Sequence, residues 1–260
     1  GIEKQDQLAG ESSLLVYFHQ PVARAVHEIA TVERRVAGAE LLEAREFADQ
    51  DWMALYRERL QPFALGRKWW VDPREPESPD VRTPAGRRLL RIPAWTAFGT
   101  GSHISTALLV RLLEGLPLSS KRILDLGTGT GILSMVALAS GAASVTALDI
   151  DPIAACVAQQ TCQLNHLRPQ IVAGSVGVLL GDSNIGTYDL AMANVIPSLL
   201  RPDLPGLVES VVPQGQILLS GILIEQEDEL LDELGEMGLE LDSRLADEGW
   251  VALQMERVST

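Results

Sequence analysis

Residues 123–131, Ile-Leu-Asp-Leu-Gly-Thr-Gly-Thr-Gly, decide the fold of this chain. An apolar segment typical of a buried strand leads into a turn with three glycines, and an apolar helical pattern follows from Ile132. Glycine tolerates the positive φ angles of such a turn and lets a ligand approach the backbone closely. Doubly wound α/β folds bind nucleotides at a glycine-rich turn after the first strand. Many strand–helix corners also carry glycine, so the turn alone leaves a purely structural role open.

Strands and helices alternate outward from this turn, from Ala94 to the end of the sequence. The expected strands are 122–126, 144–149, 170–173, 188–193 and 215–220, with a last pair near 239–244 and 249–256. The expected helices are 103–115, 131–140, 152–165, 197–211 and 225–237. Alternation at this spacing predicts an α/β fold with a parallel, doubly wound sheet.

The segment before Ala94 has a different pattern, typical of a small α+β module. We expect strands at 14–18, 39–47 and 69–71, a helix over 22–36 and a short helix beginning at Asp51. Four of the 14 prolines fall within 72–86, which favours a linker or an exposed loop. The predicted organisation is therefore a module over 1–71, a Pro-rich linker over 72–93 and a second domain over 94–260.

Charge divides the 260 residues in the same way. Residues 1–93 hold 14 Lys and Arg against 15 Asp and Glu, whereas residues 94–260 hold 7 against 20, a net charge of −13. An anionic domain repels nucleic acid and attracts cations or basic polypeptides, although acidity also serves solubility alone. No apolar run approaches the ~20 residues of a membrane helix. The two cysteines are too few for a disulfide framework or a tetrahedral zinc site. We expect a cytoplasmic protein without a metal.

An acid ends the second predicted strand. Asp149 follows Val-Thr-Ala-Leu, 22 residues after Gly127, where a carboxylate can accept hydrogen bonds from both ribose hydroxyls of a nucleoside. The alternative is that Asp149 or Asp151 only caps the next helix. Asp151 followed by Pro152 fits that cap well, which leaves Asp149 for a ligand.

The glycine spacing separates two ligands. A dinucleotide site has the pattern Gly-x-Gly-x-x-Gly, whereas the glycines here fall at 127, 129 and 131. Asp125 adds a negative charge beside the turn, which disfavours a pyrophosphate and favours a cationic ligand. S-adenosylmethionine carries a sulfonium and an ammonium and no phosphate. The pattern resembles the class I methyltransferase signature, and NAD binding is the less favoured alternative.

Two further segments suit this reading. The fourth strand ends at Asn194, followed by Val-Ile-Pro. Class I methyltransferases of amides and adenine amines carry Asn/Asp-Pro-Pro-aromatic here, and the missing aromatic residue makes an aliphatic amine a better fit than a planar base or amide. Asn194 could also be an ordinary turn residue. The segment 97–106 places Thr106 on the first turn of a helix, where its hydroxyl can face the site. His103 is a candidate general base, but a cap or packing role is more common for such a histidine.

Together these segments resemble the bacterial ribosomal protein L-eleven methyltransferase family. The residues that carry the resemblance are Ala97-Phe98-Gly99-Thr100-Gly101, His103, Thr106, the 125–131 turn, Asp149-Ile150-Asp151-Pro152, Ala193-Asn194, Leu219-Ser220-Gly221-Ile222-Leu223 and Glu248-Gly249-Trp250-Val251. The likeness is dense over 94–260 and weak upstream. It implies a seven-stranded Rossmann-like methyltransferase sheet with a smaller α+β module. It also implies that Thr106, Gly127, Gly129, Asp149 and Asn194 bind S-adenosylmethionine.

The sequence departs from the family in two places. His-Ile-Ser-Thr stands at 103–106 where the family usually has His-Pro-Thr-Thr. The family's ferredoxin-like recognition module is entered partway, near Ile2, so its first strand and helix are expected to be missing. The first departure leaves Thr106 in place, and the second bears on how a protein substrate is recognised.

The resemblance implies N-methylation of lysine side chains and of the N-terminal amine of a ribosomal protein. The expected partner is a basic protein, with no direct nucleic-acid binding and no membrane. Positioning and desolvation of a neutral amine are expected to supply most of the acceleration, and no general base is assigned. Two alternatives stay open. One is methylation of another protein's lysine or of a small-molecule amine, and the other is a cofactor-binding adaptor without turnover.

Overall fold

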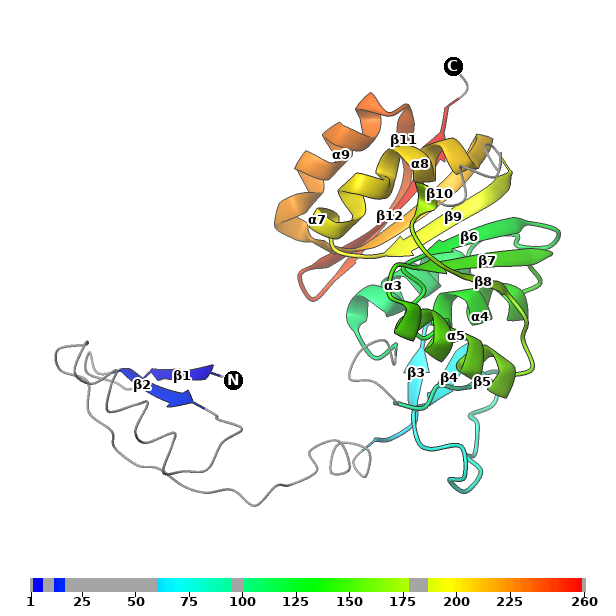
Figure 1. The fold of residues 1–260 in the computed structure, drawn as a ribbon, viewed down its shortest axis with the longest axis vertical. Coiled ribbons are helices and arrows are strands. Elements are labelled where there is room, and N and C mark those ends of the chain that lie inside the picture. The colour runs from blue at the N-terminus through cyan, green and yellow to red at the C-terminus, as the bar shows by residue number, and fades with distance from the viewer. Residues whose placement is uncertain (1, 7–11, 17–59, 95–100, 178–186, 259–260) are drawn as a thin grey trace. The chain divides into compact units, whose positions relative to one another are not determined.

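The computed structural model describes residues 2–6, 12–16, 60–94, 101–177 and 187–258, in two compact units, Gly1–Leu55 and Tyr56–Thr260 (Figure 1). In the first unit, β1 (Ile2–Asp6) and β2 (Ser12–Val16) pair antiparallel. The predicted strand 14–18 overlaps β2, and β1 was missed because four of its five residues are polar. The helix expected over 22–36, the strand over 39–47 and the helix from Asp51 lie outside the described residues.

A seven-stranded sheet organises the second unit, in the order β11-β12-β10-β9-β6-β7-β8. Its strands are β6 (Arg122–Leu126), β7 (Ser144–Asp149), β8 (Gln170–Ala173), β9 (Tyr188–Asn194), β10 (Val211–Leu223), β11 (Leu239–Asp247) and β12 (Trp250–Arg257). The strands from β8 to β10 pair parallel, and β12 is antiparallel to both β10 and β11. The predicted doubly wound sheet is confirmed, with an antiparallel hairpin at one edge.

Helices lie on both faces of this sheet (Figure 1). They are α3 (Ile104–Leu113), α4 (Ile132–Ala139), α5 (Pro152–Leu164), α7 (Pro197–Leu200), α8 (Leu204–Ser210) and α9 (Glu227–Glu236), with 3₁₀ turns η1 (Arg201–Asp203) and η2 (Ile224–Gln226). The single helix expected over 197–211 is broken into three pieces, because Pro202 and Pro205 cannot donate backbone hydrogen bonds. Asp151 caps α5 as predicted, accepting from Ile153 N at 2.8 Å.

Two hydrophobic cores, one on each face, hold the sheet between the helices. Successive strand residues point to opposite faces, so Leu190 and Met192 of β9 join the core that contains α3 and α4. Ala191 and Ala193 join the core that contains α8 and α9. Burial on both faces explains why the central strands are almost continuously apolar.

A smaller sheet packs against α3 in the same unit. It consists of β3 (Phe63–Leu65), β4 (Trp69–Asp72) and β5 (Arg88–Arg91), of which the sequence predicted β4. Glu114, which ends α3, accepts hydrogen bonds from the backbone N–H groups of Arg67 and Lys68 at 2.8–3.0 Å. Compactness therefore divides the chain after Leu55, whereas the sequence pattern suggested a division after residue 71.

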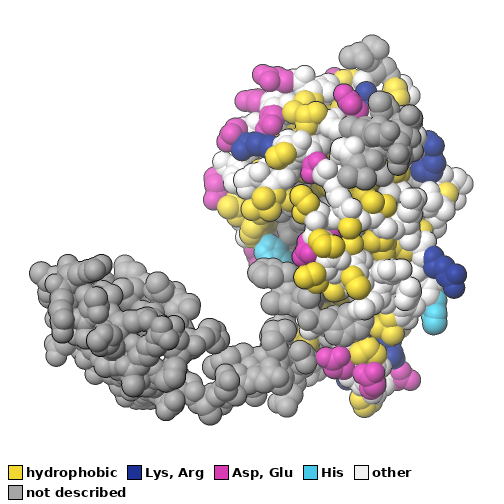
Figure 2. Space-filling model, viewed as in Figure 1, with side chains coloured by type: hydrophobic (Ala, Val, Ile, Leu, Met, Phe, Trp, Pro, Cys, Tyr) yellow, Lys and Arg dark blue, Asp and Glu magenta, His cyan; other side chains and the backbone are white. Residues whose placement is uncertain are grey.

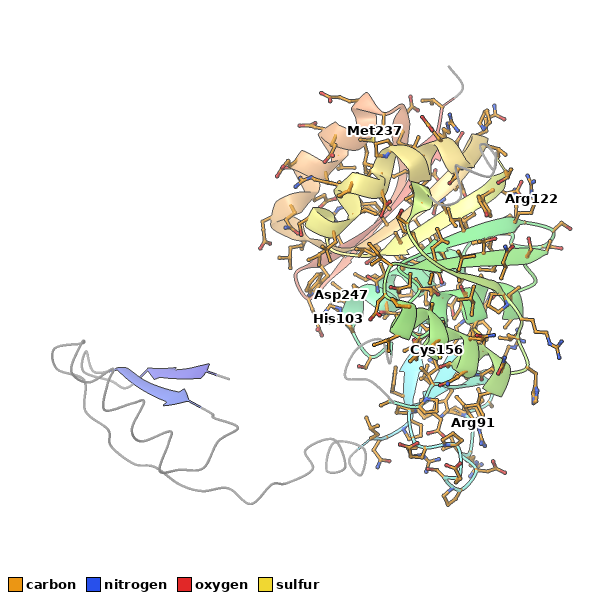
Figure 3. All side chains as sticks on the ribbon, viewed as in Figure 1. Arg91, His103, Arg122, Cys156, Met237 and Asp247 are labelled. Atoms are coloured by element: carbon orange, nitrogen blue, oxygen red, sulfur yellow. The ribbon has the colours of Figure 1, made fainter. Side chains whose placement is uncertain are left out.

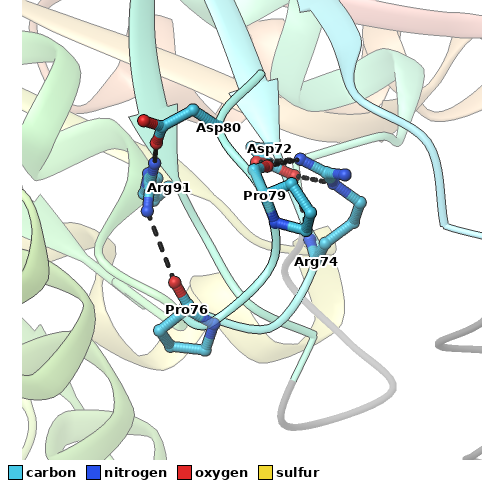
Figure 4. A network of polar contacts seen from close by, with 6 residues as sticks. All are labelled: Asp72, Arg74, Pro76, Pro79, Asp80 and Arg91. Carbon is cyan, nitrogen blue, oxygen red and sulfur yellow. Dashed lines mark hydrogen bonds and ion pairs between the residues drawn. The ribbon is translucent and has the colours of Figure 1, made fainter.

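The Pro-rich segment connects β4 to β5 and is fixed by two arginines (Figure 4). Arg74 forms two hydrogen bonds to the Asp72 carboxylate at 2.8 and 3.0 Å and one to the Pro79 carbonyl. Arg91 contacts Asp80 and the Pro76 carbonyl. Burial acts to raise the pKa of Asp72, but the bonds from Arg74 outweigh it and lower that pKa below its usual value. These bonds give the segment a defined conformation.

Candidate functional site

The site lies where the order of the parallel strands reverses. β6 lies between β7 and β9 in the sheet. From β6 the chain continues to β7 on one side, and from β9 it continues to β10 on the opposite side. Open α/β sheets bind ligands in the crevice at this point. The predicted residues Gly127, Gly129, Asp149 and Asn194 all lie at or just beyond these strand ends.

The turn after β6 requires glycine at its first position. Gly127 has φ +72°, and its N–H donates to the Leu148 carbonyl at 2.9 Å. A Cβ atom added at Gly127 would lie 2.6 Å from Cγ2 of Val195, which follows Asn194. The turn is thus packed against β7 on one side and against the end of β9 on the other.

Asp149 is bonded to this turn. Its Oδ2 accepts from Gly129 N at 2.9 Å, and its Oδ1 accepts from Asp151 N at 3.0 Å. Each carboxylate oxygen keeps a second acceptor site, so both can still accept from a ligand. A Cβ atom added at Gly129 would meet nothing within 4 Å, so open space adjoins the carboxylate. Ile150, which the sequence analysis quoted without a role, is 81% exposed directly after Asp149.

Asp125 braces the turn from inside the protein. Its fully buried Oδ2 accepts from Thr128 Oγ1 at 2.7 Å, from Ser134 Oγ at 2.6 Å and from Ser134 N at 3.1 Å. Its Oδ1 is buried with no hydrogen-bond partner among the described residues. Burial raises the pKa of Asp125 to about 6 despite these bonds. From its place in the sequence, Asp125 was expected only to influence the charge of the ligand, and its hydrogen bonds to Thr128 and Ser134 were not predicted.

The first turn of α3 meets the end of β9 directly. Asn194 Nδ2 donates to Oγ1 of the buried Thr106 at 3.0 Å. Next to this pair, Ser220 Oγ of β10 lies 3.0 Å from the Ser105 carbonyl and 3.2 Å from the Val251 carbonyl. Three strands and one helix therefore meet around Asn194. The next residue, Val195, packs against Gly127 and so links the Thr106–Asn194 pair to the glycine turn.

His103 caps α3. Its Nδ1 accepts from Ser105 N at 3.2 Å and lies 2.8 Å from Ser105 Oγ. Its ring stands edge-on to Trp250, with centroids 4.7 Å apart. Figure 3 shows His103 on the same side of the molecule as Asp247, which pairs with Trp250 across the β11–β12 turn. The capping and packing alternative is what the structure shows. The neighbouring residues 97–100 lie outside the described part of the chain.

The sequence profile described as "Ribosomal protein L11 methyltransferase (PrmA)" matches residues 2–258 of this chain. The chain belongs to the ribosomal protein L11 methyltransferase family. The family predicted from the sequence is thereby confirmed.

Individual relatives agree with the ribosomal protein L11 methyltransferase profile. A protein of this name from Chromohalobacter salexigens is 36% identical over 206 residues, covering 79% of this chain and 67% of the relative. Another, from Trichlorobacter lovleyi, is 33% identical over 217 residues, covering 81% and 69%. The crystal structure of a ribosomal protein L11 methylase from Lactobacillus delbrueckii subsp. bulgaricus superimposes with a TM-score of 0.68 at 26% identity, covering 77% of this chain and all of that one.

The described residues offer neither a membrane-spanning helix nor a cluster of metal ligands. None of the described helices combines the length and apolar composition of a bilayer-crossing segment. Within the described ranges, no three His, Cys, Asp or Glu side chains gather as metal ligands would. The polar groups of the site are thus hydroxyl, amide, carboxylate and backbone groups.

Proposed function

We propose that this chain is an S-adenosylmethionine-dependent N-methyltransferase that modifies lysine side-chain or N-terminal amino groups of ribosomal protein L11. Membership of the family supports the reaction and the substrate. One structural observation carries the assignment of the site. The Thr106–Asn194 pair and the Gly129–Asp149 pair lie on either side of the Gly127 turn, at the carboxyl ends of the parallel strands.

The residues at these strand ends fit the cofactor. Asp149 offers acceptor sites for two ribose hydroxyls, and the backbone at Gly129 is open for close approach. The exposed Ile150 offers an apolar face to the adenine ring. Thr106 and Asn194 would bind the opposite end, which carries the amino acid part. In this proposal Gly127 shapes the turn that joins the two ends.

The chemistry needs a neutral amine held in line with a methyl group. The cofactor supplies that methyl group as an electrophile attached to a sulfonium. Asn194 Nδ2 donates to Thr106 Oγ1, which leaves Asn194 Oδ1 available to accept an N–H from the bound reactants. A lysine amine has a pKa of ~10.4 in water, and its desolvation at the site favours the neutral form. No described residue is assigned as a general base, because His103 Nδ1 is engaged with Ser105.

Charge supports a basic protein as the partner. Residues 94–260 carry 20 acidic and 7 basic side chains, which attracts a lysine-rich polypeptide and repels nucleic acid. The proposal thus includes a cytoplasmic reaction without direct nucleic-acid or membrane binding. It also includes the amino-terminal residues as the substrate-recognition module, for which we take the compact unit Gly1–Leu55.

Incubation of the purified protein with S-adenosylmethionine and purified ribosomal protein L11 tests this function, with mass spectrometry reading each modified amine. The expected result is a mass increase of one or more methyl groups on lysine or the N-terminal amine. The Asn194→Ala variant serves as the control for a contaminating activity. An unmodified substrate, together with measurable cofactor binding, would favour the non-catalytic adaptor instead.

A further inference from the structure

Three apolar side chains remain exposed just beyond the ends of β9 and β10. Ile196 is 48% exposed, Leu199 is 67% exposed and Ile224 is 44% exposed. We call these three residues the apolar rim. Figure 2 shows hydrophobic side chains gathered on this face of the second unit beside a hollow. Neighbouring exposed apolar groups bordered by polar ones mark interaction sites more often than ordinary surface does.

The apolar rim is continuous with the proposed active site. Ile196 comes two residues after Asn194. Leu199 N donates to the Ile196 carbonyl at 3.0 Å, so the side chains of Ile196 and Leu199 lie on one helical turn. Val195 is bonded to the end of β10 through Ser220 at 3.1 Å. On the other side, Ile224 N donates to the Gly249 carbonyl at 3.0 Å in the β11–β12 turn. These bonds fix the apolar rim at the strand ends that hold Asn194.

Carboxylates border the apolar rim. Glu225, Asp247 and Glu248 are exposed, and none of them forms an ion pair with Lys or Arg within the described residues. Two arginines near these elements are already paired: Arg201 of η1 with Glu229 and Glu233, and Arg244 of β11 with Glu227. The border of the apolar rim therefore carries negative charge that its own surroundings do not neutralise.

We infer that the apolar rim docks the methyl-accepting segment of the substrate protein, a stretch with apolar side chains beside a lysine. This inference rests on the proposed function. The aliphatic stem of the accepting lysine suits the apolar rim, while the bordering carboxylates attract other basic residues of the same substrate protein. Covering the apolar rim also removes water from around the amine, which favours the neutral form that accepts a methyl group.

A binding measurement that needs no turnover tests the inference. Ribosomal protein L11 is titrated into the enzyme saturated with S-adenosylhomocysteine, the reaction product, using wild type, Ile196→Ser and Leu199→Ser. Leu241→Ser is the matched control. Leu241 is 45% exposed but pairs with Met255, which lies opposite Ile217, far from the strand ends at the site.

The two rim variants are expected to bind the substrate protein roughly tenfold more weakly, as for anchor residues of an interface, with a matching rise in KM. Cofactor affinity and Tm should equal those of Leu241→Ser. Leu199→Lys should weaken binding more than Leu199→Ser, because it repels a basic segment.

Each other outcome overturns the inference in a recognisable way. If wild type methylates ribosomal protein L11 and both rim variants match Leu241→Ser, the function stands and the docking surface lies elsewhere. If wild type neither binds nor methylates that protein, the proposed function fails and the apolar rim fails with it. Loss of cofactor affinity in the rim variants would assign these side chains to the cofactor site. A self-associating wild type that the variants make monomeric would assign them to contact between copies.

Discussion

Asn194 donates a 3.0 Å hydrogen bond to Thr106 across 88 residues of sequence. Thr106 lies on the first turn of α3, and Asn194 is the last residue of β9. The bond fixes the orientation of the Asn194 amide, because Nδ2 is committed to the threonine. Its Oδ1 therefore has a defined direction at the edge of the sheet. The same contact makes a helix that precedes the sheet part of the site.

Thr106→Val keeps the shape of the side chain and removes the hydroxyl. The lost hydrogen bond is worth about 1–1.5 kcal/mol, so kcat/KM with ribosomal protein L11 should fall roughly tenfold. Thr106→Ser keeps the hydroxyl and should stay within about threefold of wild type in the same assay. Equal activity of the valine variant and wild type would contradict a role for the amide's orientation.

Asp149→Ala should weaken S-adenosylmethionine binding by about 2–4 kcal/mol in a calorimetric titration, because two charge-assisted bonds to the ribose are lost. The same variant releases Gly129 N and Asp151 N, so its Tm should also fall. Asp149→Asn keeps one acceptor and should be milder on both measurements. A cofactor affinity within about threefold of wild type in the alanine variant would remove the ribose assignment.

Gly129→Ala separates backbone strain from ligand exclusion. Gly129 has φ +56°, where an L-residue costs about 1–2 kcal/mol, and an added Cβ meets no protein atom within 4 Å. Gly86 also has a positive φ, +80°, and open space around an added Cβ, in the segment before β5 and away from the site, which makes Gly86→Ala the control. Both variants should lose similar stability in chemical denaturation. Only Gly129→Ala should lose cofactor affinity, and an equal loss in both would contradict the proposed ligand position.

Asp125 gives stability a measurable pH dependence. Burial raises its pKa from 3.8 to about 6, so between these values the folded state holds a proton that the unfolded state releases. Stability from this group is therefore greatest at low pH and is lost as pH rises toward about 6, by about 3 kcal/mol in total. The unfolding free energy of wild type, minus that of Asp125→Asn, should rise as pH falls from 6.5 to 4. A difference independent of pH would contradict the raised pKa.

Removal of residues 1–55 tests the proposed recognition module. Thr106, Gly127, Gly129, Asp149 and Asn194 all belong to the second unit, so cofactor affinity should be nearly unchanged. Methylation of ribosomal protein L11 should fall at least about 100-fold, because docking no longer raises the local concentration of the substrate. The deletion must stop before β3, whose sheet is bonded to α3 through Glu114. Undiminished methylation would assign substrate recognition to the second unit alone.

The sequence predicted the central sheet well because those strands are buried on both faces. β6 and β7 match their predicted ranges, since apolar runs flanked by turn residues leave little choice of boundary. β8 also matches its predicted range, although it is a partly exposed edge strand. β3 and β5 escaped prediction because three or four residues carry no periodicity, and Arg88 and Arg91 flank the two leucines of β5. The compact units meet after Leu55, whereas the sequence pattern placed a boundary after residue 71, and side-chain bonds of Arg74 and Arg91 give the Pro-rich segment a defined conformation. A cluster of prolines indicates only the local backbone conformation and does not by itself locate a boundary between compact units.

The candidate site was predicted from motif residues, and its internal bonds were not. Spacing indicated that Asp149 was left for a ligand once Asp151 had taken the cap. The structure adds that Asp149 also holds Gly129, which depends on how β7 meets the turn after β6. The bond between Thr106 and Asn194 joins residues too far apart for any local pattern to reveal. Trp250, quoted only as part of a motif, reaches His103 because β12 returns beside β10.

Ser220 connects the surroundings of Asn194 to β12, the last strand of the sheet to be synthesised. Its hydroxyl lies between the carbonyl of Ser105 and the carbonyl of Val251, a residue of the last strand. During translation the Gly127 turn can form once β6 and β7 have left the ribosome. The wall around Asn194 is completed only after β12 has been made and has paired with β10. A growing chain therefore lacks this wall until it has been synthesised through β12.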